Sequence, residues 1–521
     1  MKIVLISTYE LGRQPFGVVS PAAWLRKRGH EVACFDLTRQ RLDEGTVRAA
    51  GLIAIYLPMH TATRLAVKLI PLLRQENPRA HICCYGLYAP MNAEYLRRLG
   101  VGTILGGEFE NGLVGLAGRL GGTYPESDEI FPQGLKPTDE AFRVSDLKVQ
   151  HTTPANFRTW DAGNVEQMEP VISLERLRFE VPDRTGMPAL EKYAHLIVPR
   201  DGFRVVGSTE ASRGCKHLCR HCPIVPVYNG VFRIVGRDVV MADVRQQVAA
   251  GAQHISFGDP DFFNGIKHAL ELVAAFHAEF PGVTYDVTIK IEHLRKYEKH
   301  LTTLRDTGCL FVISAVESVD DTILEQLDKG HTREDFLHVA RTFRSRGMTL
   351  HPTFVAFTPW TTMEGYLDLL GVLAAEELVE HVAAIQLGIR LLIPEGSRLL
   401  ELEEVRNDVG AFDAESLVYP WKNADARVDD LSEIVQGIAA DADRKKEARA
   451  PAFERIWKAA HAAAGRAAPD LEIAGGIGEA VPFLSEPWYC CAEPTREQLV
   501  SIGSAAKKPI DAASVAADGF V

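Results

Sequence analysis

Short apolar runs alternate with amphipathic segments along the first part of the chain. The runs have the length and β-branched content of strands, and the segments between them have helical periodicity, as at 18–29 and 61–74. Strands that alternate with helices form a parallel, doubly wound sheet, which binds ligands beyond the carboxyl ends of its strands. We therefore predict an α/β fold that begins with a Rossmann-like domain over residues 1–122. Its expected strands are 2–8, 30–37, 51–58, 80–87 and 102–105.

A second series of apolar runs begins near Val205. Residues 123–204 separate the two series as a linker that is rich in Pro, Asp and Arg and has little periodicity. The second series predicts six βα units of a partial (β/α)6 barrel over 205–400, with its chemistry at the carboxyl ends of the strands. Residues 401–521 predict a helical C-terminal extension that ends in a Cys-Cys tail. The expected barrel strands after the first are 254–257, 285–291, 311–318, 350–357 and 385–393.

Composition narrows the class of protein. A chain of 521 residues is too long for one ordinary core. Its formal charge of −12 argues against nonspecific binding to nucleic acid, and it contains no apolar run of transmembrane length. We therefore expect neither nucleic acid nor a membrane as a partner. The nine cysteines are clustered, which indicates a reducing cytoplasm and metal or redox use, although Cys83 and Cys84 fall within an expected strand and predict core thiols.

Three of the cysteines lie in one short segment. Cys215, Cys219 and Cys222 form a C-x3-C-x2-C pattern within Ser-Arg-Gly-Cys-Lys-His-Leu-Cys-Arg-His-Cys-Pro. Three thiolates can bind three irons of a [4Fe-4S] cluster and leave the fourth iron open to a small molecule. A structural zinc site is the alternative, because His217 and His221 lie between the cysteines and spacing alone does not exclude them as ligands.

The triad resembles the signature of radical S-adenosylmethionine (SAM) enzymes. The Gly-Gly-Glu-x-Glu turn at 106–110 and the segments 182–184 and 190–193 resemble those of members with a cobalamin-binding domain, and the likeness covers about residues 1–400. It implies a [4Fe-4S] cluster on the triad, SAM at the open iron and an external electron donor such as flavodoxin or ferredoxin. The Asp-x-His-x-x-Gly element that supplies a histidine to cobalt is absent from the first loop, 8–13. The sequence therefore allows two interpretations of the N-terminal domain: it binds cobalamin, or it has lost this cofactor and kept the fold.

The same resemblance assigns residues around SAM. It places Asp259 and Asp261 at a strand end that meets the SAM ammonium, although either carboxylate could instead cap a turn. It places Glu317 and Ser318 near the ribose or the amino acid end of SAM. Arg390 is a candidate for the SAM carboxylate, and it could equally pair with a structural acid.

The tail carries a second cysteine motif. Residues 485–494, with Cys490 and Cys491 at their centre, resemble the CCAEP tail (CUAEP/CCAEP) of a radical SAM branch. Adjacent thiols suit thiophilic species such as trivalent arsenic, and the general arrangement resembles, more distantly, the radical SAM synthase of arsinothricin. A regulatory disulfide, ligands to a second cluster and inert packing are the alternatives for this pair.

These observations give a first hypothesis and two rivals. The first is an enzyme of specialised metabolism in which Cys490 and Cys491 act in catalysis, present arsenite to a SAM-derived carbon radical and so form a carbon–arsenic bond. The nearest rival is a cobalamin-dependent radical SAM methyltransferase that acts on an unactivated carbon. A rival of another class is a redox or metalloid sensor that uses a cluster and the tail thiols as a switch.

Overall fold

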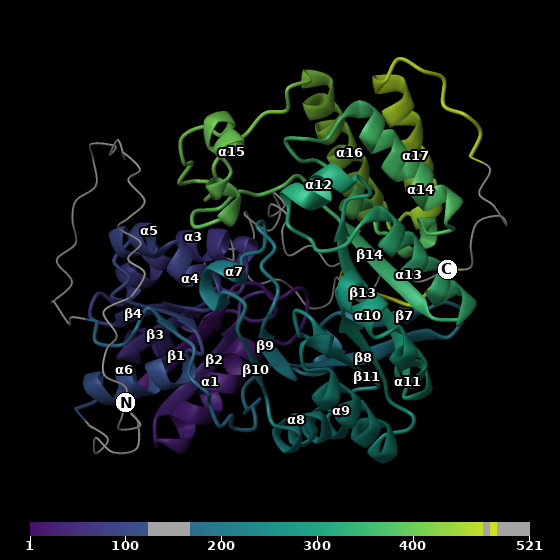
Figure 1. Cartoon of the computed structure of the whole chain (residues 1–521). Coiled ribbons are helices and arrows are strands. Elements are labelled where there is room, and N and C mark those ends of the chain that lie inside the picture. The colour runs from purple at the N-terminus through teal and green to yellow at the C-terminus, as the bar shows by residue number, and fades with distance from the viewer. Residues whose placement is uncertain (123–166, 472–479, 487–521) are drawn as a thin grey trace.

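The first half of the fold is a parallel sheet with helices on both faces (Figure 1). The structure is a computed structural model, which describes residues 1–122, 167–471 and 480–486. The strand order β2-β1-β3-β4-β5-β6 confirms the predicted doubly wound sheet, and the sixth strand comes from beyond residue 122. The strands are β1 (Lys2–Ser7), β2 (Glu31–Asp36), β3 (Leu52–Tyr56), β4 (His81–Tyr85), β5 (Thr103–Gly107) and β6 (Ile172–Ser173).

Alternate side chains of these strands enter two separate cores. Cys83 of β4 packs in the layer under α1 and α6, whereas the neighbouring Cys84 packs in the layer under α3. This is the period of two that a strand imposes, and it confirms that both thiols are core residues. The helices are α1 (Phe16–Lys27), α2 (Glu44–Ala49), α3 (His60–Glu76), α4 (Tyr88–Met91), α5 (Ala93–Arg98) and α6 (Glu110–Leu120).

The second half is a curled sheet with the order β14-β13-β12-β11-β8-β7-β15. Its parallel strands are β8 (Gly202–Thr209), β11 (His254–Phe257), β12 (Thr284–Thr288), β13 (Cys309–Glu317) and β14 (Thr349–Phe354). Two antiparallel strands, β7 (His195–Val198) and β15 (Phe483–Leu484), extend it beyond β8. The fold is thus a half-barrel that follows the N-terminal sheet.

The strand predicted at 385–393 is reduced to one isolated bridge between Phe357 and Arg390. Its first residues form a 3-10 turn, Ala384–Leu387. The apolar side chains Ile389, Leu391 and Ile393 are nevertheless buried, because they pack against the C-terminal extension rather than within the sheet. Apolar content alone therefore did not distinguish this buried segment from a sixth strand.

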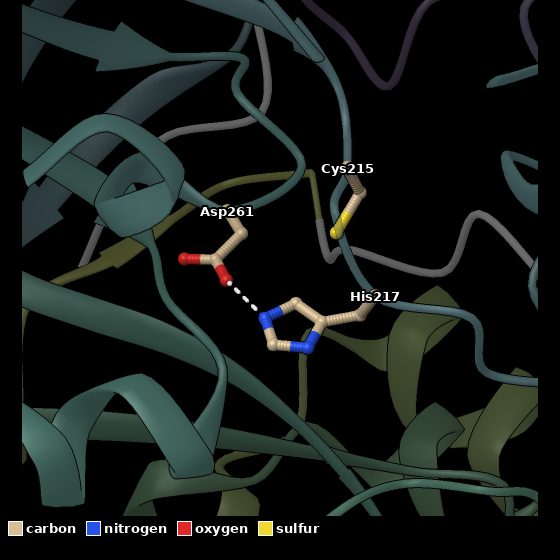
Figure 2. A group of neighbouring side chains, drawn as sticks. All are labelled: Cys215, His217 and Asp261. Carbon is tan, nitrogen blue, oxygen red and sulfur yellow. Dashed lines mark ion pairs between the residues drawn. The ribbon is translucent and has the colours of Figure 1, made fainter. Parts of the chain in front are cut away.

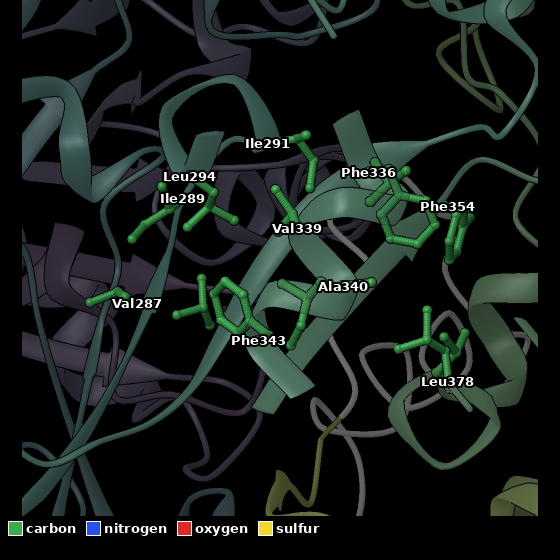
Figure 3. Close-up of a cluster of buried hydrophobic side chains, with 14 of the residues drawn as sticks. Val287, Ile289, Ile291, Leu294, Phe336, Val339, Ala340, Phe343, Phe354 and Leu378 are labelled. Carbon is green, nitrogen blue, oxygen red and sulfur yellow. The ribbon is translucent and has the colours of Figure 1, made fainter. Parts of the chain in front are cut away.

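Helices on the outer side of the half-barrel bury its main core. Figure 3 shows side chains of β12 and α10 meeting those of α13, with Phe336 and Phe343 among the fully buried rings. The outer helices are α8 (Arg237–Ala249), α9 (Ile266–Glu279), α10 (Ile291–Lys296), α11 (Leu301–Asp306), α13 (Arg333–Ser345) and α14 (Met363–Ala375). Helix α12 (Asp321–Gln326) packs instead through Ile323 in a separate core with Ile389 and Leu391. Short 3-10 turns lie at Leu190–Lys192, Phe262–Gly265, Glu298–His300, Val379–His381 and Arg398–Glu401.

The C-terminal extension is helical, as predicted, and contacts both halves. It comprises α15 (Glu403–Asp408), α16 (Ala426–Lys445) and α17 (Arg449–Ala463). Helices α16 and α17 pack against the half-barrel, with Leu431 and Ile456 in its main core. Within the described ranges, no helix has the length and apolar character needed to cross a membrane.

His60 joins the extension to the N-terminal sheet. It begins α3, is fully buried, and its Nε2 lies 2.7 Å from the carbonyl oxygen of Ser416. Burial lowers the pKa of His60 from 6.5 to about 4, so the folded chain keeps this ring neutral where the unfolded chain would protonate it.

We expect acid to weaken the fold through His60. Because the unfolded state binds the extra proton, stability falls as the pH drops from 6.5 towards 4, by about 1 kcal/mol between pH 7.5 and 5.5. A His60→Gln variant keeps an N–H donor for Ser416 without this titration. Urea unfolding of both proteins at the two pH values should show a smaller pH dependence in the variant, and equal dependences would contradict the assignment.

Candidate functional site

The three predicted cluster cysteines lie on one loop, residues 215–222, between β9 (Ser212–Gly214) and α7 (Val225–Tyr228). β9 pairs with β10 (Phe232–Ile234) and fixes the start of the loop. Gly214 directly precedes Cys215 with a φ of +72°, and a Cβ there would lie 2.5 Å from the carbonyl oxygen of Val231. Only glycine meets both conditions, so the residue before the first cysteine is determined by the backbone.

Residues at the carboxyl ends of three barrel strands contact this cluster loop. After β11, Asn264 Oδ1 lies 3.3 Å from the amide nitrogen of Lys216. After β12, Lys290 Nζ lies 3.5 Å from Cys219 Sγ. At the end of β13, Glu317 Oε1 lies 3.2 Å from the Nε2 atom of His221. The loop therefore sits where a partial barrel places its chemistry.

The thiols of the triad are shielded from water and close enough to influence one another. Cys215 and Cys219 are buried, and Cys222 is half-buried. Burial and the neighbouring Asp261 raise the pKa of Cys215 to about 11, and burial together with Cys219 raises the pKa of Cys222 further. Uncompensated thiolates are thus unfavourable here, and bound iron would supply the missing positive charge. The residues fit a metal cluster.

Carboxylates engage both histidines that the zinc alternative would use. His217 lies between Asp261, at 3.4 Å from Nε2, and Glu292, at 3.3 Å from Nδ1. His221 faces Glu317. Figure 2 shows that Cys215, His217 and Asp261 do converge, with their ligand atoms all within 4.8 Å of one another. Geometry alone would therefore also allow Cys215, His217 and Asp261 to bind a metal ion. Cys219 and Cys222 do not belong to this group.

Asp259 and Asp261 both reach the cluster loop, but in different ways. Asp259 is buried and accepts hydrogen bonds from the Ala211 amide, at 2.9 Å, and the Ser212 hydroxyl, at 2.5 Å. Burial raises its pKa to about 7. Burial also acts to raise the pKa of Asp261, but hydrogen bonds from His217 and His293 hold it below its usual value. Asp259 thus ties the start of the loop to β11, and Asp261 supports its histidine.

Asp261 also has the capping contact that the sequence left open. Its side chain accepts a hydrogen bond from the Phe263 amide, at 3.1 Å. His293 Nδ1 lies 2.6 Å from its other oxygen. Both oxygens of Asp261 therefore have neighbours within the chain, and its role toward SAM stays a prediction.

Glu317 and Ser318 lie at the end of β13, as predicted. Glu317 adopts a left-handed backbone, with a φ of +70°, and its carboxylate also contacts Lys329 Nζ at 3.4 Å. Burial opposes the charge of Glu317, but Lys329 and His221 outweigh it and lower its pKa to about 2. Ser318 is buried and accepts a hydrogen bond from the Asp320 amide. A left-handed residue and a buried ion pair at a strand end are features that functional sites often share, and the role of Glu317 and Ser318 toward SAM stays a prediction.

Arg390 is placed away from the cluster loop, in the structural pairing that the sequence left open. Its guanidinium donates to Asp429 Oδ1 and to the carbonyl oxygen of Trp421, each at 2.7 Å. It also stacks on the Trp421 ring, 3.6 Å from the centroid. These contacts attach the isolated-bridge segment to α16, and they account for Arg390 without SAM.

Arg213 joins the cluster loop to the N-terminal sheet. Its buried guanidinium contacts Glu110 at 2.7 Å and Glu108 at 3.3 Å, both from the Gly-Gly-Glu-x-Glu turn, and Glu210 at 2.8 Å. It also stacks on the ring of Phe109, 5.0 Å from the centroid. The turn after β5 therefore contacts the start of the cluster loop through two charged pairs, those of Arg213 with Glu108 and Glu110.

The carboxyl edge of the N-terminal sheet offers little to a corrin. No histidine occurs in its first loop, 8–13. The rings of Tyr56, Tyr85 and Phe109 pack against one another at tilted angles at the ends of β3 to β5, and a Cβ on Gly17 would lie 2.1 Å from the Tyr56 ring. The first loop thus supplies no histidine to cobalt, and the chain's own aromatic rings fill the adjoining strand ends.

A family comparison decides the class of the second half. Residues 209–364 match the model of the Radical SAM superfamily. The chain contains a radical SAM domain. Such a domain uses a [4Fe-4S] cluster and SAM, so the iron–sulfur interpretation of the triad is preferred over zinc.

Curated relatives resemble the chain over less than half of its length. A ribosomal protein uS12 methylthiotransferase RimO from Bacteroides thetaiotaomicron is 24% identical over 251 residues, which are 45% of this chain and 52% of the relative. A tRNA-2-methylthio-N(6)-dimethylallyladenosine synthase from Moorella thermoacetica is 24% identical over 246 residues, 44% of this chain and 53% of the relative. The chain spans about half the length of the curated relatives it matches.

Two solved structures share the fold over most of this chain. The cobalamin-dependent radical SAM enzyme OxsB, with aqua-cobalamin and SAM bound, has a TM-score of 0.60 at 12% identity and covers 85% of this chain and 67% of its own. The radical SAM methyltransferase TsrM from Kitasatospora setae, with tryptophan and a SAM analogue bound, has a TM-score of 0.55 at 18% identity and covers 72% and 71%. These likenesses confirm the predicted fold class.

Three charged residues around the radical SAM domain had no role assigned from the sequence. Arg213 lies two residues before Cys215, and Lys290 lies next to the last residue of the expected strand 285–291. Lys329 lies in the Lys-Gly-x-Thr segment that follows Glu317. Their positions were visible, but their partners come from distant parts of the chain.

The tail thiols, Cys490 and Cys491, lie outside the described residues. The segment before them is anchored between the radical SAM domain and the N-terminal sheet. β15 pairs with β7, and Glu486 accepts a hydrogen bond from the Tyr9 hydroxyl at 2.7 Å on the first loop. The resemblance of the tail to the CCAEP branch stays a prediction.

Proposed function

We propose that this protein binds a [4Fe-4S] cluster through Cys215, Cys219 and Cys222, cleaves SAM reductively there and transfers a SAM-derived carbon group to a small molecule. The observation that carries the proposal is the geometry of the triad. Two buried thiols and one half-buried thiol share one loop at the carboxyl ends of the half-barrel strands, and the other described cysteines lie elsewhere in the fold.

The chain's own residues prepare this site. When bound, the cluster supplies the electron that breaks a carbon–sulfur bond of the sulfonium. Asp259 fixes the start of the cluster loop, and Asp261 orients His217 beside Cys215. Asp261, Glu317 and Ser318 are the proposed SAM side of the site, because they follow the ends of two strands that contact the loop. The electron comes from a separate donor protein such as flavodoxin or ferredoxin.

The finer proposal for the acceptor is trivalent arsenic bound by Cys490 and Cys491. The support is the anchored segment that precedes them, since Glu486 contacts Tyr9 and lies near Arg39, both on loops of the N-terminal sheet. Cys490 follows Glu486 by four residues, and an extended chain of that length spans at most about 14 Å. Two adjacent soft thiols suit arsenite, and a carbon–arsenic bond would be the product.

Cobalamin-dependent methylation is the second candidate, and the fold comparisons favour it. OxsB contains cobalamin and TsrM is a methyltransferase. The aromatic residues at the strand ends and the first loop without histidine weigh against a bound corrin in this chain. Hydroxocobalamin that co-purifies with the protein after gel filtration, with corrin absorption, would support this candidate over the arsenic one.

We expect arsenite to change the products of SAM cleavage. The full chain is reconstituted anaerobically with iron and sulfide, and SAM and dithionite are added with and without arsenite. Mass spectrometry should find an adenosyl–arsenic or aminocarboxypropyl–arsenic adduct only in the arsenite sample. Products and rates that are indifferent to arsenite would refute the arsenic proposal, whereas reductant-dependent 5′-deoxyadenosine or methylthioadenosine alone would still exclude a non-catalytic sensor.

A double variant tests whether the tail thiols bind the acceptor or a cluster. In Cys490→Ser/Cys491→Ser the arsenic adduct should disappear while the visible spectrum of the cluster is unchanged. Loss of that spectrum would instead make the pair ligands of a cluster. Cys34→Ser, which replaces a buried thiol of the N-terminal core, should change neither readout.

A further inference from the structure

Two lysine side chains are buried against the thiol triad. Lys290 follows β12, is 8% exposed and donates to Cys219 Sγ at 3.5 Å. Lys329 is 3% exposed, and the sulfur atoms of Cys219 and Cys222 lie close enough to favour its charge. Buried lysines are rare without a charged partner, so each of these ammonium groups requires an explanation.

The charges of the two lysines are compensated to different extents. Lys329 faces the carboxylate of Glu317 at 3.4 Å, and both groups are buried, so their charges largely cancel at the site. Lys290 faces Glu292 at 3.6 Å, but the Glu292 side chain is 41% exposed and also contacts His217. Water screens an exposed carboxylate more than a buried one. Lys290 therefore directs more net positive charge at the cluster loop than Lys329 does.

The chain makes room for the Lys290–Glu292 pair. Gly330 has a φ of +72°, and a Cβ there would lie 2.8 Å from Glu292 Oε2 and 3.8 Å from Lys290 Nζ. Any other residue at this position would push the carboxylate away from its place beside the ammonium. The segment that supplies Lys329 thus also determines how closely Glu292 approaches Lys290.

We propose that Lys290 is a positioning residue that sets the reduction potential of the cluster through a charge-assisted hydrogen bond to the sulfur of Cys219, and that Glu292 moderates this effect. The inference rests on the proposed binding of the cluster by the triad. Reduction adds one negative charge to the cluster and its thiolate ligands, and an ammonium group 3.5 Å from a ligand sulfur stabilises that charge. Hydrogen bonds to cluster sulfurs are a known control of such potentials.

Three variants test the proposal with changes of opposite sign. Lys290→Met removes the charge and keeps the length of the side chain, Lys290→Arg keeps the charge, and Glu292→Gln removes the moderating carboxylate. The reconstituted full-length proteins are titrated with dithionite in the absence of SAM, and the reduced cluster is followed by electron paramagnetic resonance. Lys290→Met should shift the reduction equilibrium at least tenfold toward the oxidised state, about 59 mV for one electron. Glu292→Gln should shift it the other way, and Lys290→Arg should stay near the unmodified protein.

Each outcome of these titrations supports or overturns the proposed role of Lys290. Equal midpoint potentials for Lys290→Met and the unmodified protein, with equal iron content, would overturn the proposal. A raised KM for SAM with an unchanged potential would overturn it as well, and would assign Lys290 to SAM binding instead. If Lys290→Met binds no cluster, Glu292→Gln decides, because an unchanged potential in that variant is incompatible with the proposal. Failure of the unmodified chain to bind four irons would instead refute the proposed function.

Discussion

Replacing Cys215, Cys219 and Cys222 together by alanine is expected to abolish SAM cleavage completely. The three thiols are the proposed ligands to the cluster, and the other described cysteines belong to the hydrophobic cores. The triple variant should contain no iron after anaerobic reconstitution and lack the visible absorption of a bound cluster. Its 5′-deoxyadenosine production should fall to the background without enzyme, a loss of several orders of magnitude in rate.

A matched control separates this effect from loss of folding. Cys83→Ala, in the core between β4 and the α1–α6 layer, also removes a buried thiol, but its iron content and turnover should be those of the unmodified protein. Circular dichroism of the triple variant should show the native helix content. Iron retained at full occupancy in the triple variant would show that the cluster has other ligands.

Replacing Arg213 by methionine is expected to destabilise the protein by about 3–5 kcal/mol, the usual result of removing one partner from a buried ion pair. Arg213 is 7% exposed, and Glu108 and Glu110 are fully buried. Even beside this arginine, burial raises the pKa of Glu108 to about 7, so the carboxylate has little solvation of its own. Urea unfolding of the reconstituted chain measures the loss.

Two further variants determine whether the charge of Arg213 is responsible. Arg213→Met/Glu110→Gln should recover part of the lost stability, because it removes one of the stranded carboxylates. Arg245→Met breaks the exposed pair with Glu279 and should leave the midpoint of unfolding nearly unchanged. A loss below about 1 kcal/mol in Arg213→Met would mean that water reaches the three acids and that the junction is looser than the contacts indicate.

The sequence predicted most of the fold because most of its elements are locally encoded. Most strands of both sheets lie within a few residues of their apolar runs, and the alternation with helices determines the parallel arrangement. β6 and β7 were not predicted, because they lie within residues 123–204, which the sequence indicated as a linker. The segment 385–393 was an error of the opposite kind, a predicted strand that the sheet lacks. Its side chains are buried by the C-terminal extension, and nothing in its own pattern reports that distant partner. The antiparallel addition of β15 was unpredictable for the same reason.

The candidate site, like the fold, was predicted only in part. The spacing of the triad predicted a shared loop, and Asp259, Asp261 and Glu317 do lie around it. Arg390 did not, because its partners Asp429 and Trp421 belong to the extension. The contacts of Arg213 with Glu108 and Glu110 join residues more than 100 positions apart, which only the tertiary structure reveals.

The pairing of β15 with β7 has a consequence for aggregation. Without residues 483–484, the second sheet would have six strands instead of seven, and β7 would be its edge strand. The backbone N–H and C=O groups of β7 could then pair with other molecules. Open strand edges promote association between molecules. A chain truncated before residue 480 would therefore aggregate, and this effect would not report on the role of Cys490 and Cys491. The chemistry of the tail can be tested only by substitutions that leave β15 paired with β7.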